Sequence, residues 1–103
     1  MLDLLKNLFG FGPKVDIAEL LRNGATIVDV RTKSEYAGGH VKGSVNIPLD
    51  QIGKQIDKLK KHQPIVTCCA SGMRSGSAAG ILKSKGIEAY NGGSWASVNN
   101  KLR

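Results

Sequence analysis

Two adjacent cysteines, Cys68 and Cys69, are the only cysteines in the 103-residue chain. They open the segment CCASGMRS, in which small residues lead to Arg74. A cysteine thiolate is a strong nucleophile, and a nearby cation or inward-facing backbone N–H groups lower the pKa of a thiol. Small residues let a loop curl with its N–H groups inward, where they can also bind an oxyanion. The segment therefore indicates a thiol nucleophile that acts on an anionic substrate.

Other roles for the cysteine pair have less support in the sequence. A disulfide between neighbouring residues would close a strained ring and cross-link almost no chain. No histidines stand at zinc-ligand spacing from the cysteines, so we expect no metal site. One structural role stays open, because cysteine is also common as a small apolar core residue.

Predicted strands and helices alternate on both sides of this segment. Apolar, β-branched runs predict strands at residues 26–30, 44–47, 64–68 and 87–90. Helical periodicity predicts helices at residues 16–22, 50–61 and 74–85, and a last helix after the turn at residues 91–93. This order predicts an α/β domain with a mostly parallel sheet and helices on both faces. In such a sheet, ligands bind at the loops that follow the strands, which is where CCASGMRS lies.

The helical patterns also predict which side chains form the core. The expected buried positions are Leu49, Ile52, Ile56 and Leu59 for residues 50–61, Ala78, Ala79, Ile81 and Leu82 for residues 74–85, and Trp95, Val98 and Leu102 for the last helix. In the strand that leads to the cysteines, successive side chains point to opposite faces. Cys68 and Cys69 therefore cannot both face the loop.

Composition and charge limit the class of protein. With 15 Lys and Arg against 8 Asp and Glu, the net charge is +7, which favours anionic partners. Aromatic residues make up only 5% and no nucleic-acid motif is present, so we expect a small anionic substrate and no nucleic acid.

The sequence also bears on location and domain organisation. No apolar run reaches the ~18 residues of a membrane span, and Asp3 and Lys6 make the start unlike a secretion signal, so we expect a cytoplasmic protein. The length predicts one domain. Gly10, Gly12 and Pro13 mark its expected start, so we expect the domain at residues 14–103 and an N-terminal extension at residues 1–13 with a short helix.

Three motifs in this order resemble the rhodanese-like domain family. Residues 69–75 are similar to its active-site loop C-x-x-G-x-R-S, and residues 28–48 are similar to its D-V-R…E-[FY]…G-H-[IV]-x-G-[AS]-x-N-[IL]-P pattern. Residues 91–93 followed by Trp95 resemble its closing G-G…W turn. The resemblance covers residues 15–102 and implies a three-layer domain, with a central five-stranded parallel sheet and helices on both faces.

The resemblance implies a sulfurtransferase enzyme that works in two steps. The Cys69 thiolate takes the outer sulfur of a small anionic donor such as thiosulfate, and the resulting persulfide passes that sulfur to cyanide or a thiol, which can belong to a sulfur-accepting protein. No metal or organic cofactor is implied, and we expect a monomer. The residues expected to bind substrate are Ala70, Ser71, Gly72, Met73, Arg74 and Ser75.

Several other residues receive roles by the same resemblance. Asp29 and Arg31 are expected to support the site by bridging loops, and His40 to be a hydrogen-bonded loop residue rather than a base. Met73 either faces the pocket mouth or packs beneath the loop. Some thiosulfate-preferring members carry a basic residue inside the loop, where Ala70 and Ser71 are neutral.

Alternative functions remain open at this point. Counted from Cys68, Arg74 falls at the C-x5-R spacing of phosphatases and arsenate reductases, but Ser71 stands where that pattern has glycine. A non-catalytic binding module is a second alternative, and a persulfide carrier for a partner protein is a third. We predict that Cys69 is the nucleophile and Cys68 a core residue.

Overall fold

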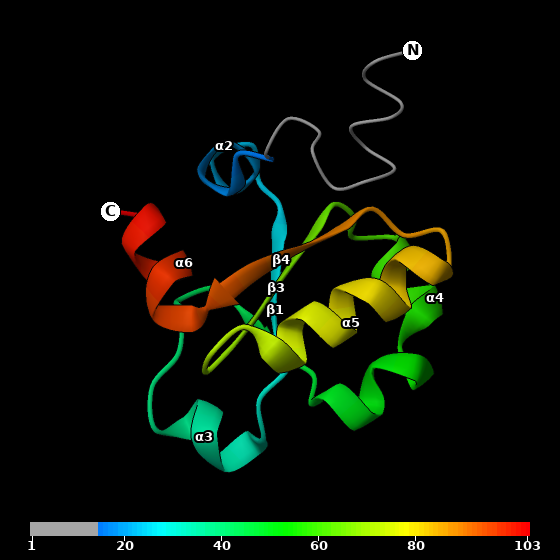
Figure 1. The fold of residues 1–103 in the computed structure, drawn as a ribbon, viewed down its shortest axis with the longest axis horizontal. Coiled ribbons are helices and arrows are strands. Elements are labelled where there is room, and N and C mark those ends of the chain that lie inside the picture. The colour runs from blue at the N-terminus through cyan, green and yellow to red at the C-terminus, as the bar shows by residue number, and fades with distance from the viewer. Residues whose placement is uncertain (1–14) are drawn as a thin grey trace.

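A parallel sheet lies between two layers of helices in the computed structural model, which describes residues 15–103 (Figure 1). The elements are α2 (Ile17–Arg22), β1 (Thr26–Asp29), α3 (Lys33–Ala37), β2 (Val45–Asn46), the 3-10 helix η1 (Leu49–Lys54), α4 (Ile56–Lys60), β3 (Ile65–Cys69), α5 (Met73–Ser84), β4 (Ala89–Ser94) and α6 (Trp95–Lys101). The helix expected within residues 1–13 lies outside the described residues. Among residues 15–103, no helix is long and apolar enough to cross a membrane.

The sheet has the order β2-β1-β3-β4, and every neighbouring pair is parallel. The α/β class and the helices on both faces are confirmed. The described residues form four strands, so the five-stranded count implied by the family resemblance is not met in this part of the chain. The four strands correspond to the four apolar runs of the sequence. Because β1 and β3 are central, the segments that follow Asp29 and Cys69 leave the sheet side by side.

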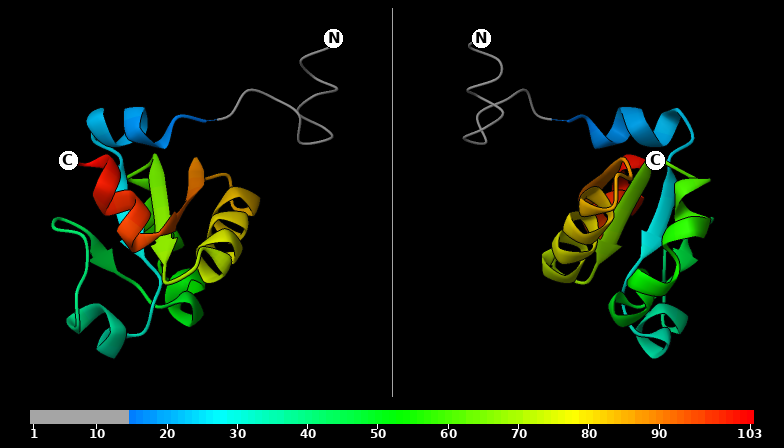
Figure 2. Two further views of the ribbon diagram at one scale, coloured as in Figure 1. Left: turned by 60° about the vertical axis from the view of Figure 1, so that its left-hand side comes forward. Right: turned by 90° about the vertical axis from the view of Figure 1, so that its right-hand side faces the viewer.

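Helices cover both faces of the sheet (Figure 2), and each face has its own hydrophobic core. The core under α5, η1 and α4 includes Ile65 and Cys69 of β3, together with Leu82. The core under α2 and α6 includes Val66 and Cys68 of the same strand. This division follows from the alternation of side chains along a strand.

The segment predicted as one helix at residues 50–61 forms two short helices. The 3-10 helix η1 ends at Lys54, and α4 begins at Ile56 after Gln55, which has φ −112° and ψ 12°. Gly53 weakens a continuous helix here, because glycine costs about 1 kcal/mol relative to alanine in a helix interior. The predicted buried face is retained: Ile52 and Leu59 are buried, and Leu49 and Ile56 pack against the same core.

The turn predicted at residues 91–93 is wrong, because these residues belong to β4. A Cβ atom on Gly92 would lie 2.7 Å from Val66 Cγ1 and 2.8 Å from both the Thr67 carbonyl oxygen and Val98 Cγ2. Only glycine therefore lets β4 approach β3 this closely. The composition Asn-Gly-Gly is typical of a turn. In the structure, the pairing of β4 with β3, which is distant in sequence, determines the conformation of these residues.

Two predicted core positions also need correction, because Ile81 and Leu102 are exposed, by 38% and 46%. Trp95 is half-buried and packs against the core under α2 and α6, with the Arg31 Cζ atom 5.0 Å from its ring centroid. Ala78, Ala79, Leu82 and Val98 are buried as predicted. The errors lie at the margins of helix faces, where periodicity alone does not fix how far a neighbouring element extends.

Candidate active site

The side chain of Cys69 lies at the end of β3 and is enclosed by the loop that follows it. Its Sγ atom accepts hydrogen bonds from the backbone N–H groups of Gly72, at 3.0 Å, and Ser75, at 3.4 Å, and the Ser75 hydroxyl lies 3.4 Å away. The loop can close this tightly because Gly72 adopts φ +100°, in the left-handed region that favours glycine. α5 begins immediately afterwards, so the sulfur also lies at the positive end of that helix.

These contacts suit a sulfur anion. Burial raises the pKa of the Cys69 thiol, but the contact with the Ser75 hydroxyl and hydrogen bonds from the N–H groups of Ser75, Gly72 and Ser71 lower it more, so the net pKa falls below its ordinary value of 9.0. The site can therefore stabilise a thiolate, and by the same contacts a negatively charged persulfide.

Asn91 of β4 contacts Gly72 and Ser75, whose N–H groups donate to the sulfur. Its Oδ1 atom accepts from the Ser75 hydroxyl at 2.7 Å and from the Gly93 N–H at 2.9 Å, and its Nδ2 donates to the Gly72 carbonyl at 3.0 Å. The Thr67 hydroxyl donates to the Ser75 carbonyl at 2.7 Å. The sequence motif included Asn91 only as part of a turn, and nothing local identified it as a support of the loop.

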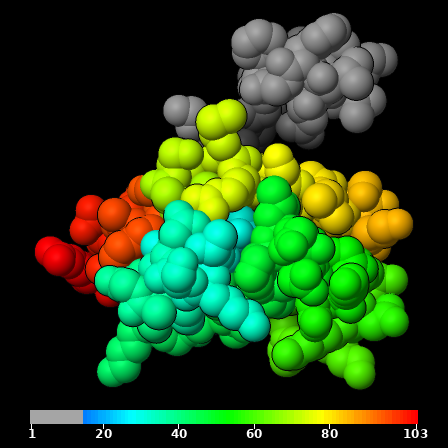
Figure 3. Space-filling model, turned by 90° about the horizontal axis from the view of Figure 1, so that it is seen from below, coloured from blue at the N-terminus to red at the C-terminus, as the bar shows by residue number. Residues whose placement is uncertain are grey.

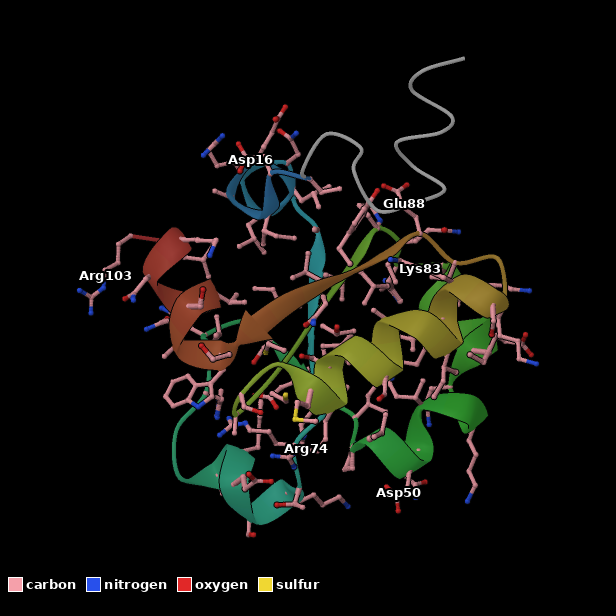
Figure 4. All side chains as sticks on the ribbon, in the orientation of Figure 1. Asp16, Asp50, Arg74, Lys83, Glu88 and Arg103 are labelled. Carbon is pink, nitrogen blue, oxygen red and sulfur yellow. The ribbon has the colours of Figure 1, made fainter. Side chains whose placement is uncertain are left out.

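Arg74 is held by a carboxylate of α3. Its two terminal nitrogens donate to Glu35 Oε1 and Oε2, at 2.7 and 3.0 Å. Figure 4 shows Arg74 at the beginning of α5, on the side of α3. Glu35 also closes a capping box with Thr32 at the start of α3. Sequence reasoning gave Glu35 no role in the site, although its place in the upstream motif was a signal.

Asp29 and Arg31 form a second, buried pair. Arg31 Nε and Nη2 donate to the Asp29 carboxylate at 2.8–3.0 Å, and its Nη1 and Nη2 donate to the carbonyls of Glu35, at 3.3 Å, and Gly39, at 2.7 Å. The pKa of Arg31 is raised, mainly by its hydrogen bonds to Asp29. These contacts link the end of β1 to α3 and to the loop beyond it, as a supporting role requires.

The remaining residues of the loop are open to solvent. Ala70 and Ser71 are exposed, and Met73 is 80% exposed, so Met73 does not pack beneath the loop. An open cleft of about 440 Å³ lies beside the loop, lined by Val30, Thr32, Pro48, Leu49, Asp50 and Arg74. Figure 3 shows this face of the molecule, where α3, η1 and the start of α5 meet.

Cys68 has none of these surroundings. Its side chain is buried in the opposite core, and burial together with the negative charge of Asp29 raises the pKa of its thiol to about 12. His40 stacks on Tyr36, with ring centroids 3.7 Å apart, and its Nδ1 lies 2.7 Å from the Tyr36 carbonyl. Among residues 15–103, no cluster of His, Cys, Asp and Glu could hold a metal ion.

A three-layer fold with an anion-stabilising cysteine loop after a central parallel strand defines the rhodanese-like class of protein. The sequence matches the rhodanese-like domain family over residues 14–99, which is most of the chain. The chain therefore belongs to the rhodanese-like domain family.

Three relatives illustrate the similarity. The protein YqhL of Bacillus subtilis is 38% identical over 68 residues, which cover 65% of this chain and 54% of YqhL. The thiosulfate sulfurtransferase GlpE of Pseudomonas fluorescens is 36% identical over 68% of this chain and 65% of GlpE. A tRNA sulfurtransferase of Thermoplasma acidophilum is 36% identical over 64% of this chain and 13% of that protein. The matched region thus spans less than two thirds of each relative.

Solved structures show the same fold. A rhodanese-like domain protein of Staphylococcus aureus is 30% identical and superposes with a TM-score of 0.68, over 80% of this chain and 86% of that chain. A rhodanese from E. coli, solved with anions, is also 30% identical, with a TM-score of 0.66 over 72% of this chain and 91% of that chain.

Proposed function

We propose that this protein is a sulfurtransferase that carries sulfur as a persulfide on Cys69. The observation that carries the proposal is the Cys69 Sγ atom held by the N–H groups of Gly72 and Ser75 at the start of α5. Relatives named thiosulfate sulfurtransferase and tRNA sulfurtransferase support the same class of reaction.

In the first step, the Cys69 thiolate attacks the outer sulfur of the donor, and the bond between the two donor sulfurs breaks. With thiosulfate, the leaving group is sulfite. In the second step, a thiol or cyanide attacks the outer sulfur of the persulfide and regenerates the thiolate. The N–H groups that stabilise the thiolate also stabilise the terminal sulfur anion, which makes this a covalent, two-step mechanism.

The phosphatase or arsenate reductase alternative has less support from the geometry. It needs Cys68 as the nucleophile, and the Cys68 side chain lies in the core under α2 and α6, where its pKa is raised to about 12. The role of a carrier for a partner protein is compatible with the exposed Met73 beside the loop. A cytoplasmic location and a monomeric state stay predictions.

A turnover assay tests the proposal. With a sulfane-sulfur donor and cyanide, we expect thiocyanate to form with the wild type and with Cys68→Ser, and not with Cys69→Ser. Circular dichroism of both variants serves as the control for folding. Equal turnover by Cys69→Ser and the wild type would contradict the proposal.

A further inference from the structure

Both guanidinium groups with contacts in the site are occupied by carboxylates. Arg74 holds Glu35 with two hydrogen bonds, and Arg31 holds Asp29 in the same bidentate manner. Hydrogen bonds from Arg74 and then Thr32 lower the pKa of Glu35 to about 2, so Glu35 is anionic wherever the Cys69 thiolate exists. The positive charge of each guanidinium is therefore already balanced by a bound carboxylate before an anionic substrate arrives.

The loop itself adds no cation that could replace them. The side chains at positions 70–73 are those of Ala, Ser, Gly and Met. The N–H groups of Gly72 and Ser75 already donate to the Cys69 sulfur. Although the net charge of the chain is +7, residues 70–73 of the loop include no lysine or arginine.

The cleft beside the loop provides a surface of different chemistry. Val30, Pro48 and Leu49 form an apolar part of its lining, and Asp50 adds a carboxylate. Its volume of about 440 Å³ has room for an organic group next to Arg74. Thiosulfate has no organic group to place there, and the Asp50 carboxylate repels a dianion.

We propose that Glu35, by occupying Arg74, makes the site selective for an organic persulfide, R–S–SH, over thiosulfate as the sulfur donor. This inference rests on the proposed function. It makes Glu35 a specificity-determining residue and the cleft the binding site of the organic group R.

The charge balance of the two reactions explains the selectivity. With thiosulfate, a thiolate meets a dianion, so three negative charges gather until sulfite leaves with two of them. With the protonated persulfide, the Cys69 thiolate attacks the outer sulfur and the S–S bond of the donor breaks. The inner sulfur leaves as R–S⁻ and takes the proton that the outer sulfur carried, which gives R–SH and the Cys69 persulfide anion. With this protonated donor, only one negative charge lies on the reacting sulfurs, compared with three in the reaction with thiosulfate, so less positive charge is needed in the site.

Glu35→Gln is the direct test, because it releases the charge of Arg74 and changes little else. A glutamine at this position can still accept the Thr32 N–H and keep the capping box of α3. Glu88→Gln is the matched control: it makes the same change in side chain and net charge, and Glu88 lies at the opposite end of the molecule from Arg74 (Figure 4). Like Glu35, Glu88 accepts a hydrogen bond, from Tyr90 at 2.8 Å.

The measurement is kcat/KM with thiosulfate and with 2-hydroxyethyl persulfide, whose organic group carries no charge, at low ionic strength and with the same acceptor. We expect the wild type to prefer the organic persulfide. In Glu35→Gln, the ratio of kcat/KM for thiosulfate to kcat/KM for 2-hydroxyethyl persulfide should rise by about tenfold. Glu88→Gln should keep the wild-type ratio.

Three results would overturn the inference: a wild type that uses thiosulfate as well as 2-hydroxyethyl persulfide, an unchanged ratio in Glu35→Gln, or the same shift in Glu88→Gln. The wild-type ratio decides the question by itself if Glu35→Gln does not fold. Failure of the proposed function is a separate outcome, because then neither donor would transfer sulfur to Cys69.

Discussion

Cys68 and Cys69 are consecutive residues of β3, and their side chains lie in separate hydrophobic cores on opposite faces of the sheet. The Cys69 sulfur faces the loop and accepts hydrogen bonds from its N–H groups. The Cys68 sulfur lies under α2 and α6, near the negative charge of Asp29. Two consecutive positions of β3 thus hold a thiol whose pKa is lowered and a thiol whose pKa is raised.

The two thiols should therefore differ in reactivity. A small alkylating reagent such as iodoacetamide should label Cys69 at neutral pH, with a rate that rises with pH through a pKa below the ordinary 9.0. Cys68 should stay unlabelled in the folded protein, because burial raises its pKa to about 12. Peptide mapping after labelling at several pH values measures the labelling rates of Cys69 and Cys68. Faster labelling of Cys68 would reverse the assignment.

Asn91 should control the pKa of the Cys69 thiol. Asn91→Ala removes the hydrogen bond that holds the Gly72 carbonyl, so the Gly72 N–H is less well placed to donate to the thiolate and the pKa of Cys69 should rise. The pH dependence of alkylation measures this shift. The rise should be clearest in a Ser75→Ala background, because there no Ser75 hydroxyl can turn from Asn91 to the sulfur.

Asn46→Ala is the control for a general loss of stability. Asn46 also donates two hydrogen bonds to backbone carbonyls, those of Asp29 and Arg31, but it contacts neither Gly72 nor Ser75. Asn46→Ala should therefore lower the free energy of unfolding without changing the pKa of Cys69. An unchanged pKa in Asn91→Ala would reduce Asn91 to a purely structural residue.

Arg74→Ala should lower turnover by about tenfold or more, because the loop loses its link to α3 and Glu35 is left unpaired beside the site. Arg74→Lys should recover only part of the activity, since lysine keeps the charge but not the two-pronged contact with Glu35. Steady-state kinetics with a persulfide donor checks both variants. Wild-type activity in Arg74→Lys would mean that charge alone matters at this position.

Gly92 should be intolerant of any side chain. In Gly92→Ala the new Cβ would lie within 2.8 Å of Val66, Thr67 and Val98, so we expect a loss of about 1–3 kcal/mol or more in the free energy of unfolding. Gly80→Ala in α5 is the control: a Cβ there meets nothing within 4 Å, and alanine should stabilise the helix by up to about 1 kcal/mol. Urea denaturation of both variants measures the free energy of unfolding. An unchanged free energy in Gly92→Ala would contradict the close approach of β4 to β3.

Sequence reasoning succeeded where local patterns determine the structure. The strand–helix alternation, the buried Ala78 and Leu82, and the burial of Cys68 and Cys69 on opposite faces all follow from periodicity. It failed where distant segments decide. The path of residues 91–93 depends on pairing with β3, and Ile81 lies just beyond the edge of a helix face.

The supports of the candidate site were the hardest part to foresee. Arg74 and Glu35 are 39 residues apart in sequence, and Ser75 and Asn91 are 16 apart. No local spacing relates such residues, so only the fold brings them together. The loop itself could be read from the sequence because its parts, from Cys69 to Ser75, are contiguous.

Intact mass spectrometry measures the transfer of sulfur to Cys69 most directly. The protein is incubated with glutathione persulfide and, separately, with thiosulfate, then freed of donor, weighed and mapped by peptide. We predict a gain of one sulfur atom on Cys69 that cyanide or dithiothreitol removes, that persists in Cys68→Ser and that is absent in Cys69→Ser. A sulfur adduct that persists in Cys69→Ser and disappears in Cys68→Ser would contradict the account.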